Sequence, residues 1–93
     1  MWVKFKDLAE KTALMRMDDM DLVHIERSEN ALLWKIGVGP FNSTQCAVIA
    51  HKITYRQAEA AVDEIFKRLA NGYIVFDLAA WLEEYEEVAH DEF

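Results

Sequence analysis

Residues 54–72 read TYRQAEAAVDEIFKRLANG, and this stretch decides the fold. Thr54 followed by Gln57 has the form of a capping box, in which each side chain satisfies a free backbone N–H at the start of a helix. Gly72 supplies the left-handed residue that commonly ends a helix. Between these signals, apolar residues recur at helical spacing and share one face. They are Ala58, Ala61, Val62, Ile65, Phe66 and Leu69. The pattern predicts an amphipathic helix over about 55–71.

Short β-prone segments precede this helix. Residues 21–27 and 31–38 alternate apolar and polar positions across a short turn, and residues 45–53 follow a loop rich in turn formers. Residues 13–17 offer a further strand, while residues 1–12 fit either a strand or a short helix. Strands joined by short turns pair antiparallel. The sequence therefore predicts a small antiparallel sheet of three to five strands.

The C-terminal part predicts a second helix. An apolar, β-prone run at 73–76 leads to Asp77, a favourable N-cap residue, and then to a helix at about 78–89. Its apolar positions at helical spacing are Leu78, Trp81, Leu82, Tyr85 and Val88 or Ala89. We therefore expect one α+β domain over residues 1–93. Helix 55–71 covers one face of the sheet, and the C-terminal helix lies on the other face or on a partner.

The strand predicted at 45–53 is apolar on both of its faces. Cys46, Val48 and Ala50 lie on one face, and Ala47, Ile49 and Ile53 lie on the other. A strand of this kind needs cover on both sides, and helix 55–71 can cover only one. The second cover must come from another element of the chain or from another chain.

The net charge of −7 is concentrated at the C-terminal end. Residues 1–76 carry ten acidic and ten basic side chains, whereas residues 77–93 carry only acids and form an acidic amphipathic segment. Such a field repels phosphate, so we expect no direct binding of nucleic acid. Lys4, Lys6, Lys11 and Arg16 form a loose basic cluster near Trp2, which we interpret as ordinary charged surface given the overall acidity. An acidic end suits a basic partner or solubility.

No pattern of residues predicts a catalytic, metal or cofactor site. His24, His51, His90 and Cys46 lack the spacing of a zinc site, and Asp18, Asp19 and Asp21 lack the alternating ligands of a calcium loop. Ser28 and Ser43 sit in apparent turns without a nucleophile elbow, and Gly37 and Gly39 end a strand rather than open a helix. We expect no enzyme activity, no metal and no cofactor.

The composition also predicts where the chain resides. Cys46 is the lone cysteine, so no internal disulfide can form. No run of about 20 apolar residues is present, and residues 1–5 do not lead into the apolar stretch of a signal peptide. We therefore expect a cytoplasmic protein that does not enter a membrane.

The aromatic content favours a binding function. Eleven aromatic residues include Trp2, Trp34 and Trp81, and such side chains are enriched at interface centres. A small core also gains from oligomerisation. We predict a non-enzymatic protein–protein interaction module that forms a homodimer. The expected partner-binding residues lie in the C-terminal helix: Trp81, Leu82, Tyr85, Glu83, Glu84, Glu86 and Glu87.

Two alternatives remain open from the sequence. One is an acidic inhibitor of the phage type that occupies the basic nucleic-acid groove of a target enzyme, where its carboxylates mimic phosphates. The other is a small enzyme, which requires a pocket with convergent polar groups. The sequence does not identify the partner, nor does it decide whether the C-terminal helix docks on its own sheet.

Overall fold

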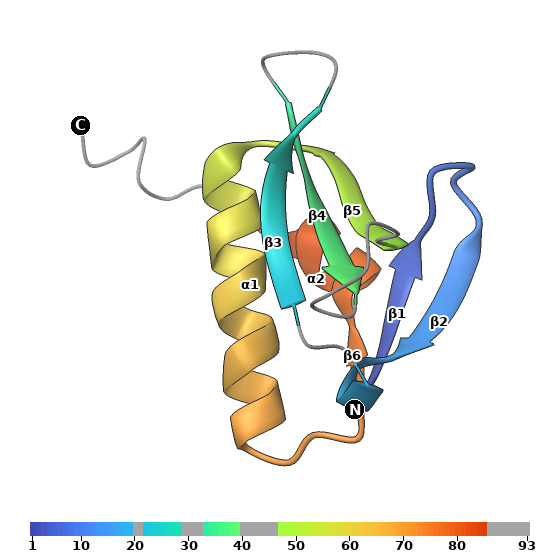
Figure 1. The fold of residues 1–93 in the computed structure, drawn as a ribbon, viewed down its shortest axis with the longest axis vertical. Helices are drawn as coiled ribbons and strands as arrows, with labels where there is room; N and C mark the ends of the chain where they lie inside the picture. Colours follow the sequence, from blue (N-terminus) through green and yellow to red (C-terminus); the bar gives the residue numbers. More distant parts are fainter. Residues whose placement is uncertain (20–21, 29–32, 40–46, 86–93) are drawn as a thin grey trace.

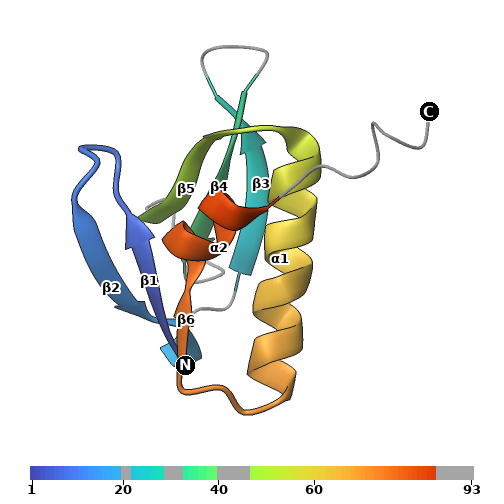
Figure 2. The same ribbon diagram turned by 180° about the vertical axis from the view of Figure 1, so that it is seen from behind.

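The computed structural model describes residues 1–19, 22–28, 33–39 and 47–85, and it confirms the α+β class (Figures 1 and 2). Within these residues the chain forms six strands, two α-helices and one short 3-10 turn. The strands are β1 (Trp2–Lys6), β2 (Thr12–Arg16), β3 (Leu22–Arg27), β4 (Trp34–Gly39), β5 (Ala47–Ile53) and β6 (Val75–Asp77). The helices are η1 (Met17–Asp19), α1 (Tyr55–Ala70) and α2 (Leu78–Glu84).

Strands β3, β4 and β5 form an antiparallel sheet in sequence order, as the sequence predicts. Its register places Val23 opposite Val38 and Ile25 opposite Ile36. Paired residues share a face of the sheet, so these four apolar side chains lie together. Ile36 and Val38 are fully buried in the core, and Val23 and Ile25 pack against it.

A second sheet has the order β2-β1-β6 and was not expected as a separate unit. β1 pairs antiparallel with β2. Residues 2–6, which fit either a strand or a short helix from the sequence, therefore form a strand. β1 also pairs parallel with β6, so Trp2 lies opposite Val75 and Val3 opposite Phe76. Alternate residues of β1 point inward, and Val3 is buried beside Phe76. The strands that the sequence assigns to one sheet are thus divided between two.

Helix α1 begins as predicted and covers the first sheet. Both hydrogen bonds of the capping box are present, with the Gln57 backbone N–H donating to Thr54 Oγ1 at 3.1 Å and the Thr54 backbone N–H donating to Gln57 Oε1 at 2.9 Å. The helix packs against β3, β4 and β5. The predicted apolar face is only partly buried, because Ala58, Ala61 and Ile65 are buried and Val62 is half-buried.

The structure corrects the prediction for the other two apolar residues of α1. The Phe66 side chain is 73% exposed, and Leu69 is also exposed. Phe66 follows Ile65 directly, so it lies about 100° further round the helix than its buried neighbour. The apolar residues of α1 therefore span a wider arc than the sheet beneath the helix can cover. Phe66 and Leu69, at the edge of this arc, face outward.

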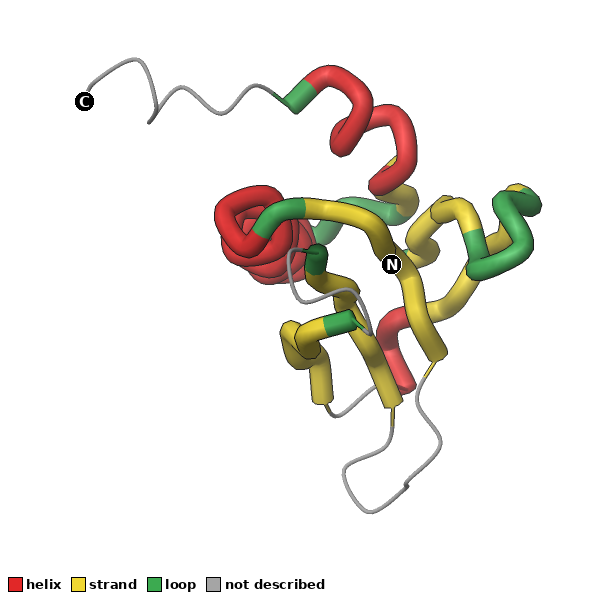
Figure 3. The backbone as a smooth tube through the Cα atoms, turned by 90° about the horizontal axis from the view of Figure 1, so that it is seen from above, coloured by secondary structure: helices red, strands yellow, loops and turns green. Residues whose placement is uncertain are grey.

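Helix α2 docks on its own chain. Asp77 caps it, because the carboxylate accepts a hydrogen bond from the Ala80 backbone N–H at 3.0 Å. Leu78 is fully buried, and the helix packs against β1 and α1. Figure 3 separates α2 at the top of the view from strands β3 and β4 at the bottom. The helix ends at Glu84, and Tyr85 follows it as an extended C-cap. The prediction of a helix to 89 is therefore wrong at Tyr85, and residues 86–89 lie outside the described residues.

The chain itself supplies cover for much of β5. Ile49, Ala50 and Ile53 are buried, and β5 contacts β1 of the second sheet as well as α1. Val48 remains half-buried, and Cys46 lies outside the described residues. Ile49, Ala50 and Ile53 are therefore covered by other parts of the same chain, and their burial requires no second chain.

The amine of Met1 anchors the end of β1 beside η1. It donates to Asp18 Oδ1 at 2.7 Å, while Arg16 Nε lies 3.5 Å from Asp18 Oδ2. The hydrogen bond from the amine lowers the pKa of Asp18 below its ordinary value of 3.8, with smaller contributions from the charge of the amine and from Arg16. Met1 belongs to the buried core, so this ion pair fixes an apolar residue as well as a terminus.

We expect Asp18→Asn to lower stability at neutral pH and to have little effect in acid. A lowered carboxyl pKa stabilises the folded state above its unfolded value of 3.8, and this contribution is lost as the pH falls through the folded pKa. Urea denaturation at neutral pH and below the folded pKa measures the difference from the native chain. Asp63→Asn, at an exposed helix position, is the control and should show no such pH dependence. An Asp18→Asn deficit that persists unchanged in acid would contradict the assignment.

Candidate functional site

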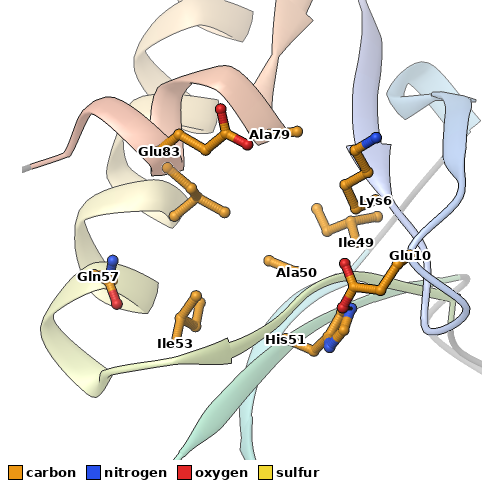
Figure 4. A pocket seen from close by; sticks show the side chains of 10 residues that line it. Lys6, Glu10, Ile49, Ala50, His51, Ile53, Gln57, Ala79 and Glu83 are labelled. Atoms are coloured by element: carbon orange, nitrogen blue, oxygen red, sulfur yellow. Dashed lines mark ion pairs between the residues drawn. The ribbon is translucent and has the colours of Figure 1, made fainter.

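A small cleft of about 200 Å³ lies between β1, β5 and α2 (Figure 4). Its floor is apolar and consists of Ile49, Ala50 and Ile53 from β5 and Leu82 from α2. Its rim carries polar side chains from five different segments. They are Lys6, Glu10, His51, Gln57 and Glu83. A floor of this kind with a mixed-charge rim is the usual form of a small-molecule site, although this cleft is smaller than the usual range of about 300–1,000 Å³.

Most of the rim groups already hold the fold together. The His51 Nε2–H donates to the Asp7 carbonyl at 3.0 Å and lies 3.4 Å from Glu10 Oε1. The Asp7 carboxylate accepts from the Ala9 and Lys11 backbone N–H groups, at 2.9 and 3.0 Å, and so shapes the turn between β1 and β2. His51 therefore ties this turn to β5 and joins the two sheets.

Two of the remaining rim groups, Lys6 and Gln57, have similar structural partners, whereas Glu83 forms no ion pair with a described residue. Lys6 Nζ donates to Thr12 Oγ1 at 2.9 Å across the β1–β2 pair, and Gln57 is engaged in the capping box of α1. None of the described residues that line the cleft is a serine, threonine or cysteine. The arrangement offers a shallow binding site with a charged rim, and no hydroxyl or thiol side chain is among the described residues that line it.

Two residues beside the cleft have left-handed backbone conformations. Glu10 has φ 62° in the β1–β2 turn, and Lys52 has φ 57° in β5, next to His51. Their side chains meet, since Lys52 Nζ lies 3.9 Å from Glu10 Oε1. Non-glycine residues enter this region at a cost of roughly 1–2 kcal/mol each. The corner where the turn meets β5 is therefore strained.

A second feature is a cluster of exposed apolar side chains at one end of the molecule. Nine large hydrophobic residues are exposed in the described part of the chain, and six of them come from the end of α1, the approach to β6 and the start of β1. We call these six the apolar end surface: Trp2, Phe66, Leu69, Tyr73, Ile74 and Val75. This end, where α1 finishes and β1 begins, is the lower end in Figure 1.

The strand pairing brings the chain segments of three of these residues together. Trp2 lies opposite Val75 in the β1–β6 pair, and its backbone N–H donates to the Ile74 carbonyl at 2.8 Å. The Ile74 side chain is 77% exposed, the most of any large hydrophobic residue described. Leu69 and Tyr73 lie on either side of the turn that follows α1, and both are exposed.

Arg68 fixes the position of this turn. Its guanidinium carbon lies 5.0 Å from the centre of the Tyr73 ring and 4.3 Å from that of Phe76, and its Nε donates to Glu64 Oε2 at 2.6 Å. Arginine over aromatic faces is attractive, by about 0.5–2 kcal/mol according to burial. The Tyr73 backbone N–H also donates to the Arg68 carbonyl at 3.0 Å. Of the apolar end surface, Tyr73 is therefore held by Arg68.

The structure places the predicted partner-binding residues in two environments. Trp81 and Leu82 pack against the core, and the Trp81 ring lies 6.3 Å from that of Phe76 and 5.2 Å from that of Tyr85. Glu83 and Glu84 are exposed on α2. Glu86 and Glu87 lie outside the described residues. Among the described members of the predicted site, Trp81 and Leu82 thus pack inward while Glu83 and Glu84 face solvent, and the binding role of the site stays a prediction.

Sequence reasoning missed Phe66 and Ile74 as surface residues. The signals were present but ambiguous. Phe66 widens the apolar arc of α1 beyond a single stripe, and the run Tyr73-Ile74-Val75-Phe76 has four apolar residues in succession. A strand with one buried face cannot bury four consecutive side chains, so part of such a run must face outward.

The other histidine that the structure describes has a local role. His24 contacts Glu26 through Nε2, and its ring packs over Gly37 on the neighbouring strand. A Cβ atom at position 37 would approach His24 Cε1 to 2.8 Å, so glycine makes room for the ring. Ser28 donates from Oγ to the Leu33 carbonyl. His90, Ser43 and Cys46 lie outside the described residues.

Lys4, Lys6 and Arg16 share the outer face of the β2-β1-β6 sheet with Trp2 and Leu14. Lys4 Nζ lies 3.7 Å from Asp77 Oδ2, and Arg16 is paired with Asp18. Across the described ranges, no three metal-binding side chains come together, and none of the helices is long and apolar enough to cross a bilayer.

No model of a known protein family matches this chain, and searches of curated proteins and of solved structures also found no match.

We expect Lys52→Gly to be more stable than Lys52→Ala by up to about 1 kcal/mol, because glycine has no Cβ to oppose the left-handed conformation. Thermal or urea unfolding of the two variants measures the difference. At Lys4, in the middle of β1, the order should be reversed, because glycine weakens an ordinary strand. The same order at both positions would show that Lys52 is not strained.

Proposed function

We propose that this chain is a non-enzymatic protein-interaction module that binds its partner through the apolar end surface. The observation that carries the proposal is the grouping of six exposed large hydrophobic residues at one end of a 93-residue chain. Three of the six are Trp2, Phe66 and Tyr73, and aromatic residues of this kind dominate binding energy at interfaces.

The size of this surface supports the proposal. With exposed fractions between 39% and 77%, the six residues together present on the order of 600 Å² of largely apolar area, which is comparable to the largest patch on a typical monomer. At about 25 cal/mol per Å², full burial of this area is worth on the order of 15 kcal/mol before the costs of association. A surface of this size favours binding to a protein.

The cleft beside β5 supports an enzyme less well. Its histidine is held by a backbone carbonyl, its lysine by Thr12 and its glutamine by the helix cap. Each of these groups makes a hydrogen bond within the fold, and that bond accounts for its position. We therefore place the function at the apolar end of the molecule.

Protein capture from native extract tests the binding surface. We expect Ile74→Asp and Phe66→Asp to lose the specific partner, because each places a charge at the centre of a desolvated contact. Leu8→Asp is the matched control, since Leu8 is 66% exposed in the β1–β2 turn and lies outside the apolar end surface. Equal capture by all four proteins would contradict the proposal.

The acidic C-terminal segment favours a second candidate, the inhibitor that occupies a basic nucleic-acid groove. Seven acidic residues and no lysine or arginine lie in 77–93, and the exposed Glu83 and Glu84 form no ion pair with described residues. Carboxylates along one segment can take the place of phosphates in a positive channel. This candidate uses α2 and the residues after it rather than the apolar end surface.

The inhibitor candidate predicts binding that weakens steeply with salt. We expect neutralisation of Glu83, Glu84, Glu86 and Glu87 to Gln to abolish binding to a basic nucleic-acid enzyme, measured by titration at increasing ionic strength. The same set of changes should leave capture through the apolar end surface intact. Binding that is independent of salt would remove this candidate.

A further inference from the structure

We propose that the cleft between β1, β5 and α2 binds an aliphatic α-amino acid in its zwitterionic form. The cleft shares no residue with the apolar end surface, so this inference adds a small-molecule site to the proposed interaction module. The ammonium of the ligand binds Glu83, its carboxylate binds Lys6, and its side chain lies on the apolar floor.

One of the two glutamates on the rim already has partners within the fold. Glu10 Oε1 lies 3.4 Å from His51 Nε2 and 3.9 Å from Lys52 Nζ. His51 is itself held by the Asp7 carbonyl, as described above. Among the described residues that line the cleft, Lys6 and Glu83 are therefore the two charged groups without an ion-pair partner.

Lys6 and Glu83 carry opposite charges but do not pair with each other. Figure 4 shows Glu83 on the α2 side of the cleft and Lys6 on the β1 side. The Lys6 ammonium donates once, to Thr12 Oγ1 at 2.9 Å, so two of its three N–H donors remain for a ligand. Glu83 is exposed and accepts no hydrogen bond from a described residue. A ligand that bears both charges is the electrostatic complement of this arrangement.

A second hollow beside the cleft shows where the two charges lie relative to the floor. Its volume is about 240 Å³, and it shares Lys6, Ala79 and Glu83 with the cleft. The floor residues Ile49 and Leu82 line the cleft alone. The apolar floor therefore lies to one side of both charges. An α-amino acid, with both charges at one end and its side chain beyond them, matches this layout better than an ω-amino acid with a charge at each end.

The floor favours an aliphatic side chain of about four carbons. Ile49, Ala50 and Ile53 are buried and Leu82 packs against the core, so the floor presents carbon rather than hydrogen-bonding groups. The cleft volume of about 200 Å³ equals the space of roughly six or seven waters, at about 30 Å³ each. This space suits the side chain of leucine, isoleucine or methionine. Glycine would gain nothing from the floor, because it has no apolar surface to bury.

The charges around the cleft do not favour a ligand of a single sign. In the second hollow, Lys4 Nζ lies 3.7 Å from Asp77 Oδ2, so this pair adds no net charge to the rim. A phosphate-bearing ligand would meet the unpaired Glu83, and a simple amine would leave the Lys6 ammonium without an acidic partner. The zwitterion satisfies both groups.

Titration of the full chain with L-leucine, followed by calorimetry and NMR, tests this site. We expect a dissociation constant of about 0.1–1 mM, which is within reach of a ligand of about nine non-hydrogen atoms. Resonance shifts should be confined to the cleft residues. Leucinamide lacks the carboxylate and isocaproate lacks the ammonium, so each should bind about 10-fold more weakly than leucine.

Variants of the two charged groups assign the contacts. Glu83→Gln should weaken leucine binding about 10-fold and leave isocaproate binding unchanged, because isocaproate has no ammonium. Lys6→Met should weaken leucine binding to a similar extent and leave leucinamide binding unchanged. Glu84→Gln, at the next residue of α2, and Lys11→Met, in the β1–β2 turn, are the matched controls, because neither residue lines the cleft. Both controls should bind leucine with native affinity.

All four substitutions replace exposed side chains, and unchanged amide spectra away from the cleft verify that each variant folds. Absence of leucine binding up to about 10 mM would overturn the site. Native affinity in both Glu83→Gln and Lys6→Met would place the ligand elsewhere and overturn the assignment. Leucinamide or isocaproate binding as tight as that of leucine would overturn the zwitterion, and tighter binding of an ω-amino acid such as ε-aminocaproate would overturn the α-amino acid class.

Discussion

The parallel pairing of β1 with β6 is the interaction on which the rest of the structure depends. It joins residues 2–4 to residues 75–77, so the two parts of the described chain that are furthest apart in sequence lie side by side. Through this pairing Phe76 enters the core beside Val3, and Leu78 follows it as the first residue of α2. Without it, the second sheet would be a two-stranded hairpin, which is marginally stable in water.

The same pairing creates both surfaces considered for function. It sets Trp2 beside Val75 and Ile74, which forms the centre of the apolar end surface. At its other end it directs the chain from Asp77 into α2, whose Ala79, Leu82 and Glu83 form one wall of the cleft. Both surfaces therefore depend on the β1–β6 pair, one at each end of it. A change in the register of this pair would alter both.

The parts of the fold that the sequence predicts are those encoded locally. The capping box of α1, the end of that helix at Asn71 and the antiparallel order of β3, β4 and β5 depend on residues a few positions apart. Asp77 likewise acts as the predicted N-cap because its carboxylate and the Ala80 N–H are three residues apart. Such signals can be interpreted without knowledge of the rest of the chain.

The division into two sheets could not be predicted in this way. Parallel pairing of β1 with β6 depends on contacts over more than seventy positions, and a three-residue strand carries almost no pattern of its own. The predicted apolar face of α1 failed at Phe66 for a related reason, because the width of the sheet beneath a helix is set by tertiary packing. The surface proposed for binding differs from the predicted one, since Trp81 and Leu82 pack against the core while Ile74 and Phe66 are exposed, and the binding role of α2 stays a prediction.

The cleft and the apolar end surface differ in how far folding explains the residues found there. At the cleft, the polar side chains of His51 and Gln57 have internal partners, so their identity is explained by folding. At the apolar end surface, folding explains the supporting Arg68 and Phe76 but not the outward Ile74 and Phe66. Exposed side chains of this size increase the tendency to aggregate, and a polar residue at either position would cost the monomer little. The proposed partner, by covering Ile74 and Phe66, would account for two residues that the packing of this chain does not explain.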